Sequence, residues 1–161
     1  MSEESTEDLV QLAWDALPSR HRQLLEQIGA SRWEIVDRAL GMWVPELRLV
    51  LINDGHQELR SADPPTREAL VTWIAWHEWG HALSVTGFSN HDPSEGARLL
   101  GLAPPGIRER IRKGGYRRSQ YIHELIAETY ALLMRESVEG RPGRPKWLPD
   151  EIYQLTTRIG A

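Results

Sequence analysis

The chain of 161 residues is 40% hydrophobic and 26% charged, which is the balance of a single globular domain. A formal net charge of −4 disfavours nucleic acid as a partner, and the lack of cysteine excludes a disulfide framework, a thiolate zinc finger and a cysteine nucleophile. The acidic N-terminus has no apolar run behind it, and no stretch is long enough for a membrane span. We therefore expect a cytoplasmic protein without a signal peptide or a membrane partner.

Apolar residues at helical spacing predict a series of short helices in the first part of the chain, interrupted at Pro18 and Gly29. These helices are expected at residues 7–17, 20–29 and 31–40. The segment 46–52 then alternates and becomes continuously apolar, which predicts a strand, and residues 53–55 give a turn signal after it. A partner strand is expected within 56–61, so the sheet should be small.

The longest helical pattern follows at residues 66–85, where Pro65 suits the start of the helix and Gly87 marks its end. Residues 88–120 are interrupted by Pro and Gly and are expected to hold one or two short helices. The remaining expectations are a long helix at 119–137, a terminal helix at 149–159, and flexible segments at 1–6 and 140–146. Together these elements predict a single α+β domain over residues 1–161 that is mostly helical.

His77 and His81 lie four residues apart in the helix expected at 66–85, so their imidazoles share one face and can bind one metal ion. Glu78 lies about 100° around the helix, where it is better placed to take a proton from a water at the metal than to be a ligand. The helix is apolar nearly all round, which indicates burial, and buried imidazoles need polar partners. A metal supplies them, although incidental histidines on a polar face are the simpler alternative. Gly80 would permit the close approach of a neighbouring element.

A catalytic zinc needs three protein ligands and an open position. The glycine and third histidine that metzincins carry downstream of His81 are missing, which excludes that class. His91 could be a ligand, but it lies in a turn-like segment, where a surface histidine is more common. A better source is the helix expected at 119–137, in which Glu124 and Glu128 share one face. Glu124 would bind the metal and Glu128 would hold the free N–H of a ligating histidine, although an exposed acidic stripe is the alternative.

At these residues the chain resembles the gluzincin clan of zinc metallopeptidases, in which an HExxH helix is paired with a second helix carrying Glu-x-x-x-Asp or a close variant. Residues 124–134 are similar to the E-x-x-A-[ND]-x-[FY]-A pattern of ImmA/IrrE-type proteases and minigluzincins. The resemblance covers two segments, 66–85 and 119–137. It departs from the family pattern at position 128, which is Glu instead of Asp or Asn, and in a longer gap between the two helices.

The resemblance implies that His77, His81 and Glu124 bind Zn²⁺. Because the gap between the two helices is longer than in the family pattern, Glu128 is the first substitute for Glu124 as the third ligand. The resemblance implies that Glu78 is the general base and that Glu128 otherwise supports a ligand from the second shell. It also implies a zincin-like fold, with a small mixed sheet packed on the active-site helix and a strand from residues 46–52 near the cleft.

Residues 105–118 carry six cations and one anion, a local charge of +5, with two adjacent glycines in the middle. The simpler interpretation is a solvated loop, and the alternative is a flap near the cleft that recruits an acidic partner or substrate. Peptide hydrolysis also needs a donor to the oxyanion. The candidate donors are Tyr116, Tyr121, His91 and His123.

The sequence as a whole predicts a zinc metallopeptidase that cleaves a peptide or protein substrate, with Glu78, Tyr116 and Tyr121 as its candidate catalytic residues. The alternative from another class is a catalytically silent, metal-stabilised regulatory or interaction module. A helical protein that binds no metal is the second alternative. The substrate and the oligomeric state are left open.

Overall fold

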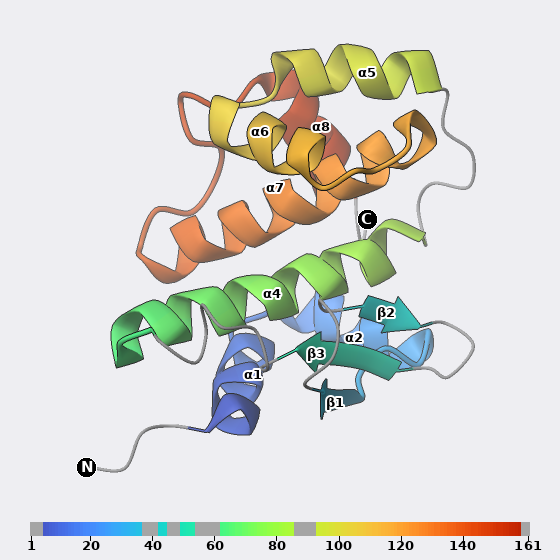
Figure 1. Ribbon diagram of the computed structural model, residues 1–161. Helices are drawn as coiled ribbons and strands as arrows, with labels where there is room; N and C mark the ends of the chain where they lie inside the picture. Colours follow the sequence, from blue (N-terminus) through green and yellow to red (C-terminus); the bar gives the residue numbers. More distant parts are fainter. Residues whose placement is uncertain (1–4, 37–41, 45–48, 54–61, 86–92, 159–161) are drawn as a thin grey trace.

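A computed structural model describes residues 5–36, 42–44, 49–53, 62–85 and 93–158 (Figure 1). In chain order its elements are α1 (Thr6–Asp15), α2 (Ser19–Gln27), β1 (Trp33–Val36), β2 (Met42–Val44), β3 (Leu49–Asn53), α4 (Pro64–Val85), α5 (Pro93–Leu102), α6 (Pro105–Lys113), the 3-10 helix η2 (Arg118–Gln120), α7 (Tyr121–Val138) and α8 (Asp150–Thr157). The chain is mostly helical with one small sheet, which confirms the α+β class.

Helix α4 crosses the middle of the molecule between two layers (Figure 1). The sheet, α1 and α2 lie on one side of α4, and α5 to α8 lie on the other. The predicted helix at 66–85 is confirmed. Pro64 and Pro65 lie in its first turn, where backbone N–H groups form no hydrogen bond within the helix, so proline is tolerated there. None of the described helices is long and apolar enough to cross a membrane.

The sheet has the order β1-β3-β2, with β1 parallel and β2 antiparallel to the central strand β3. The strand expected at 46–52 is found as β3, beginning at Leu49, and residues 45–48 lie outside the described part of the chain. The partner strand expected at 56–61 also lies outside the described residues, so it stays a prediction. The partners that the structure does describe, β1 and β2, both precede β3 in the sequence.

The helix expected at 31–40 is wrong over residues 33–36, which form β1, and residues 37–40 lie outside the described part of the chain. This segment pairs with β3 in a register that sets Trp33 opposite Val50 and Ile35 opposite Ile52. Val50 and Ile52 are fully buried. The backbone hydrogen bonds between β1 and β3 therefore place β1 next to the hydrophobic core. The β-branched and aromatic residues of β1 suit a strand, and a long-range pairing of this kind overrides a weak helical pattern.

Two tryptophans of α4 attach this helix to the N-terminal layer. The indole N–H of Trp76 donates to the carbonyl of Ala13 at 3.0 Å, and that of Trp79 donates to the carbonyl of Ala30 at 3.2 Å. The ring of Trp79 is fully buried and meets Trp14 edge-on at a centroid distance of 5.3 Å. These contacts fix the rotation of α4 about its axis, and with it the direction in which the histidine face points.

The other layer packs on α4 mainly through α7, whose residues 124–131 are all buried. A Cβ added at Gly80 would lie 3.1 Å from the backbone Cα of Ala127 and 3.1 Å from the Cβ of Tyr130. Gly80 therefore permits the close approach of α7 that the sequence suggested. The expectation of one or two short helices within 88–120 is confirmed by α5 and α6.

The two segments expected to be flexible are partly described. Ser5 caps α1, because its side chain accepts a hydrogen bond from the backbone N–H of Asp8 at 3.1 Å. Residues 140–146 form the connection after α7, in which Gly140 and Gly143 adopt positive φ values of 87° and 91°. The flexibility of both segments stays a prediction.

Candidate metal centre

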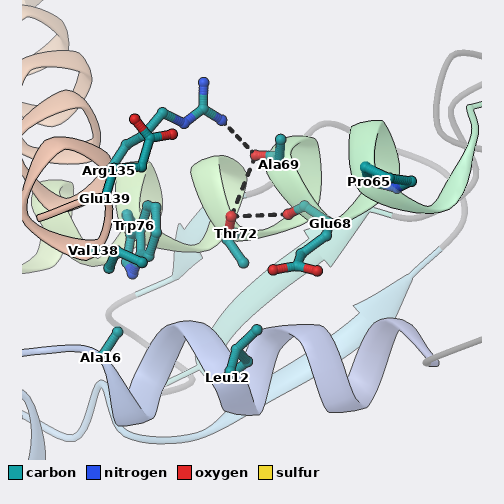
Figure 2. Close-up of a pocket in the computed structure, with 10 residues that line it drawn as sticks. All are labelled: Leu12, Ala16, Pro65, Glu68, Ala69, Thr72, Trp76, Arg135, Val138 and Glu139. Atoms are coloured by element: carbon teal, nitrogen blue, oxygen red, sulfur yellow. Dashed lines mark hydrogen bonds between the residues drawn. The ribbon is translucent and has the colours of Figure 1, made fainter.

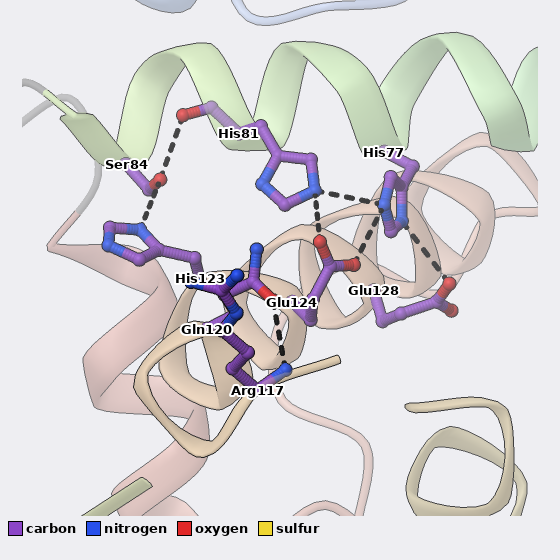
Figure 3. Close-up of polar contacts among 8 residues, drawn as sticks. All are labelled: His77, His81, Ser84, Arg117, Gln120, His123, Glu124 and Glu128. Atoms are coloured by element: carbon purple, nitrogen blue, oxygen red, sulfur yellow. Dashed lines mark hydrogen bonds and ion pairs between the residues drawn. The ribbon is translucent and has the colours of Figure 1, made fainter. Parts of the chain in front are cut away.

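His77 and His81 project from α4 toward two carboxylates of α7 (Figure 3). The two Nε2 atoms lie 3.1 Å apart. The carboxylate of Glu124 lies across them, with Oε2 at 3.3 Å from the Nε2 of His77 and Oε1 at 3.0 Å from the Nε2 of His81. These three residues each offer one ligand atom to a common point, so they could hold a metal ion.

The spacing and the chemistry of these atoms fit a catalytic zinc. Ligands at about 2.0–2.1 Å from a tetrahedral ion lie about 3.3–3.4 Å from one another, close to the 3.0–3.3 Å found here. Two imidazoles and one carboxylate form a known catalytic ligand set that leaves a position open. In the described structure Glu124 Oε2 is also buried without a well-formed hydrogen bond, and a cation would satisfy it.

Glu128 approaches His77 from the side away from the other imidazole (Figure 3). Its Oε1 lies 3.2 Å from Nδ1 of His77, while Nε2 of the same ring faces Glu124. A proton held on Nδ1 by the carboxylate leaves the Nε2 lone pair free for a metal. This is the arrangement in which a second carboxylate orients a ligating histidine.

The electrostatics of the cluster show an excess of negative charge around the imidazoles. Burial lowers the pKa of His77, but the contacts with Glu124 and Glu128, helped by the charge of Glu78, outweigh burial and raise this pKa to about 10. Burial raises the pKa of Glu124, but the contacts with His77 and His81 outweigh it and lower the pKa to about 2. The cluster therefore attracts a proton strongly, and it would attract a divalent cation for the same reason.

Glu78 and Tyr116 both lie close to this cluster. Glu78 is buried, and its charge contributes to the raised pKa values of His77 and Tyr116. The pKa of Tyr116 is raised to about 12, by burial first and then by the charge of Glu124 and a hydrogen bond to it. The structure thus brings the expected base and one expected oxyanion donor to the same site.

The other candidate donors have different surroundings. Tyr121 packs on α5, because a Cβ added at Gly96 would lie 3.3 Å from the Cβ of Tyr121. His123 lies toward the end of α4, with Nδ1 at 3.5 Å from Oγ of Ser84 (Figure 3). His91 lies outside the described residues.

Sequence reasoning missed one contact of the site. It treated the basic segment 105–118 as a solvated loop or a flap, whereas residues Pro105–Lys113 form α6 and Arg110 turns toward the site. Nη2 of Arg110 lies 3.1 Å from Oε2 of Glu128. No local pattern distinguishes Arg110 from the other cations of the segment, because its partner is on another helix.

A described groove lies elsewhere, between α1, α4 and α7 (Figure 2). It has a volume of about 430 Å³. It is lined by Leu12, Ala16, Pro65, Glu68, Ala69, Thr72, Trp76, Arg135, Val138 and Glu139, and hence by none of the candidate metal ligands. The described residues that line this groove form no cluster of metal-ligating side chains, so the candidate metal centre stays at His77, His81 and Glu124.

Comparisons with protein-family models, with curated proteins and with solved structures give no match to this chain. The similarity to gluzincins therefore rests on residues 77–81 and 124–134 and on the geometry that joins them. That geometry is compatible with an HExxH-type zinc site.

Proposed function

We propose that this chain is a zinc-dependent peptidase of the gluzincin type with a zincin-like fold, in which His77, His81 and Glu124 hold the ion. The observation that carries the proposal is the convergence of two Nε2 atoms and one carboxylate from two helices, at separations of 3.0–3.3 Å. The contact of Glu128 with His77 supports it, because that contact selects the tautomer that a metal needs.

Zinc bound at this position would supply a Lewis acid, which polarises a carbonyl group and lowers the pKa of a water molecule. Glu78 accepts a proton from the water as its oxygen bonds to the carbonyl carbon of the substrate. Glu78 then delivers this proton to the amide nitrogen as the C–N bond breaks. The hydroxyl of Tyr116 donates a hydrogen bond to the carbonyl oxygen as that oxygen gains negative charge. We favour Tyr116 over Tyr121 for this role because Tyr116 contacts Glu124.

The proposal is tested by comparing wild type with Glu78→Gln on a library of peptides read by mass spectrometry. Both proteins should bind one zinc per chain, and cleavage should be lost only in Glu78→Gln, since this change removes the base and keeps the size of the side chain. Glu26→Gln, at an exposed position of α2, is the matched control and should cleave like wild type.

The alternative, a catalytically silent module stabilised by the metal, predicts a different result in the same assay. Zinc would then be present at one per chain and neither protein would cut any peptide. Equal cleavage by wild type and Glu78→Gln would contradict the role given to Glu78.

A further inference from the structure

Arg110 of α6 contacts Glu128, the residue that faces His77 of the candidate metal centre. Ile107 and Ile111 are buried and hold α6 against the core, and Arg110 lies between them in the sequence. Nη2 of Arg110 forms an ion pair with Oε2 of Glu128 at 3.1 Å. Since Oε2 is buried and makes no hydrogen bond in the described structure, this ion pair is the polar contact that it has there.

A second contact holds the guanidinium of Arg110 in place. Its Cζ lies 4.9 Å from the ring centroid of Trp73, which is one turn before His77 on α4. Arg135 lies over the same ring at 4.7 Å and donates to the carbonyl of Ala69 at 2.8 Å. The side chain of Arg110 is 54% exposed, and stacking on the ring of Trp73 restricts its rotation. Arg110 therefore holds its positive charge beside Glu128.

The two oxygens of Glu128 therefore have different partners. Oε1 faces Nδ1 of His77 at 3.2 Å, and Oε2 faces Arg110. A glutamate has three rotatable side-chain bonds, and a single contact at one oxygen leaves the carboxylate free to turn. Contacts at both oxygens fix the plane of the group.

We propose that Arg110 is a positioning residue of the metal centre: it fixes the carboxylate of Glu128 and, through it, the ring of His77. This inference rests on the zinc binding included in the proposed function. Arg110 touches neither the ion nor the substrate, and it acts only through Glu128.

The positioning role and a purely electrostatic role predict opposite effects on zinc affinity. The positive charge of Arg110 repels a divalent cation, so its removal would tighten zinc binding if charge alone mattered. If Arg110 orients Glu128, its removal weakens zinc binding, because partners of this kind contribute about 10–100-fold to metal affinity.

The experiment measures the zinc dissociation constant of the full chain by competition with a chromophoric chelator. Arg110→Met keeps the apolar stem over Trp73 and should weaken zinc binding about 10-fold. Arg112→Met is the matched control, since it removes the same charge from an exposed position of α6, and its affinity should stay within about twofold of wild type. Arg110→Lys, which keeps the charge without the planar fork, should fall between wild type and Arg110→Met.

A double-mutant cycle tests whether Arg110 acts through Glu128. In a Glu128→Gln background, Arg110→Met should cause no further loss of zinc affinity. As a spectroscopic check, the Nδ1–H proton resonance of His77 in the zinc-loaded protein should move upfield in Arg110→Met and stay unchanged in Arg112→Met.

Three results would overturn this inference. They are unchanged or tighter zinc binding by Arg110→Met, an equal loss in Arg112→Met, and a full 10-fold loss that persists in the Glu128→Gln background. A wild-type chain that binds no zinc would overturn the proposed function together with this inference, whereas zinc binding that Arg110→Met leaves unchanged would overturn the inference alone.

Discussion

The close contact between α4 and α7 at Gly80 gives a prediction that links the fold to the site. In Gly80→Ala the new Cβ would lie 3.1 Å from Cα of Ala127 and 3.1 Å from Cβ of Tyr130. Neither atom belongs to the far end of a flexible side chain, so the two helices must separate by a few tenths of an ångström. Overpacking of this kind costs about 1–3 kcal/mol.

The same substitution also has a favourable effect, because alanine is better than glycine inside a helix by about 1 kcal/mol. Gly101→Ala isolates this effect, since Gly101 lies near the end of α5 and a Cβ there would meet no atom within 4 Å. We expect Gly101→Ala to be neutral or up to about 1 kcal/mol more stable than wild type. Gly80→Ala should be less stable than Gly101→Ala by about 1–3 kcal/mol.

Urea unfolding of the metal-free proteins, followed by circular dichroism, measures this difference. The separation of the helices would also move Glu124 away from His77 and His81, so zinc affinity should fall in Gly80→Ala and stay unchanged in Gly101→Ala. If Gly80→Ala were as stable as Gly101→Ala and bound zinc like wild type, the inferred contact between α4 and α7 would be refuted.

Three further predictions concern the metal and the site. Zinc at 100 times its dissociation constant should stabilise the chain by about 2.7 kcal/mol in thermal or urea unfolding, and no such shift should occur in His77→Ala. The protonated form of His77 stabilises the metal-free chain fully below the unfolded pKa of 6.5, and this stabilisation is lost as the pH rises through about 10. Because zinc must displace that proton, its affinity should rise up to about tenfold per pH unit between pH 7 and 9, and a flat profile by chelator competition would contradict the assignment. Tyr116→Phe should lower kcat/KM about 100-fold by removing an oxyanion donor while zinc affinity changes little, and unchanged kinetics would exclude this role.

Much of the helical framework could be predicted because its signals are local. The apolar spacing of 66–85 and 119–137 and the prolines and glycines near the helix ends predicted α4 and α7 to within a few residues. The pairing of Glu124 and Glu128 with the histidine helix also followed from helical faces. Buried carboxylates and partly buried imidazoles need polar partners, and each supplies the other where the two helices meet.

The features that could not be predicted depend on contacts between distant segments. Strand β1 exists because Trp33 and Ile35 pair beside Val50 and Ile52, and no window of neighbouring residues contains that information. The choice between Tyr116 and Tyr121 depends on which helix each one packs against. Arg110 could not be distinguished from the other cations of 105–118, because its role arises only when α6 lies against Trp73 and Glu128.

Anomalous diffraction at the zinc absorption edge would show whether His77, His81 and Glu124 hold one zinc ion, as we propose. We expect a single strong anomalous peak at about 2.0–2.2 Å from Nε2 of both histidines and from a carboxylate oxygen of Glu124, with Glu128 hydrogen-bonded to His77 and not bound to the ion. A crystal grown with zinc that shows no peak at these residues, or a peak whose carboxylate ligand is Glu128, would contradict this proposal.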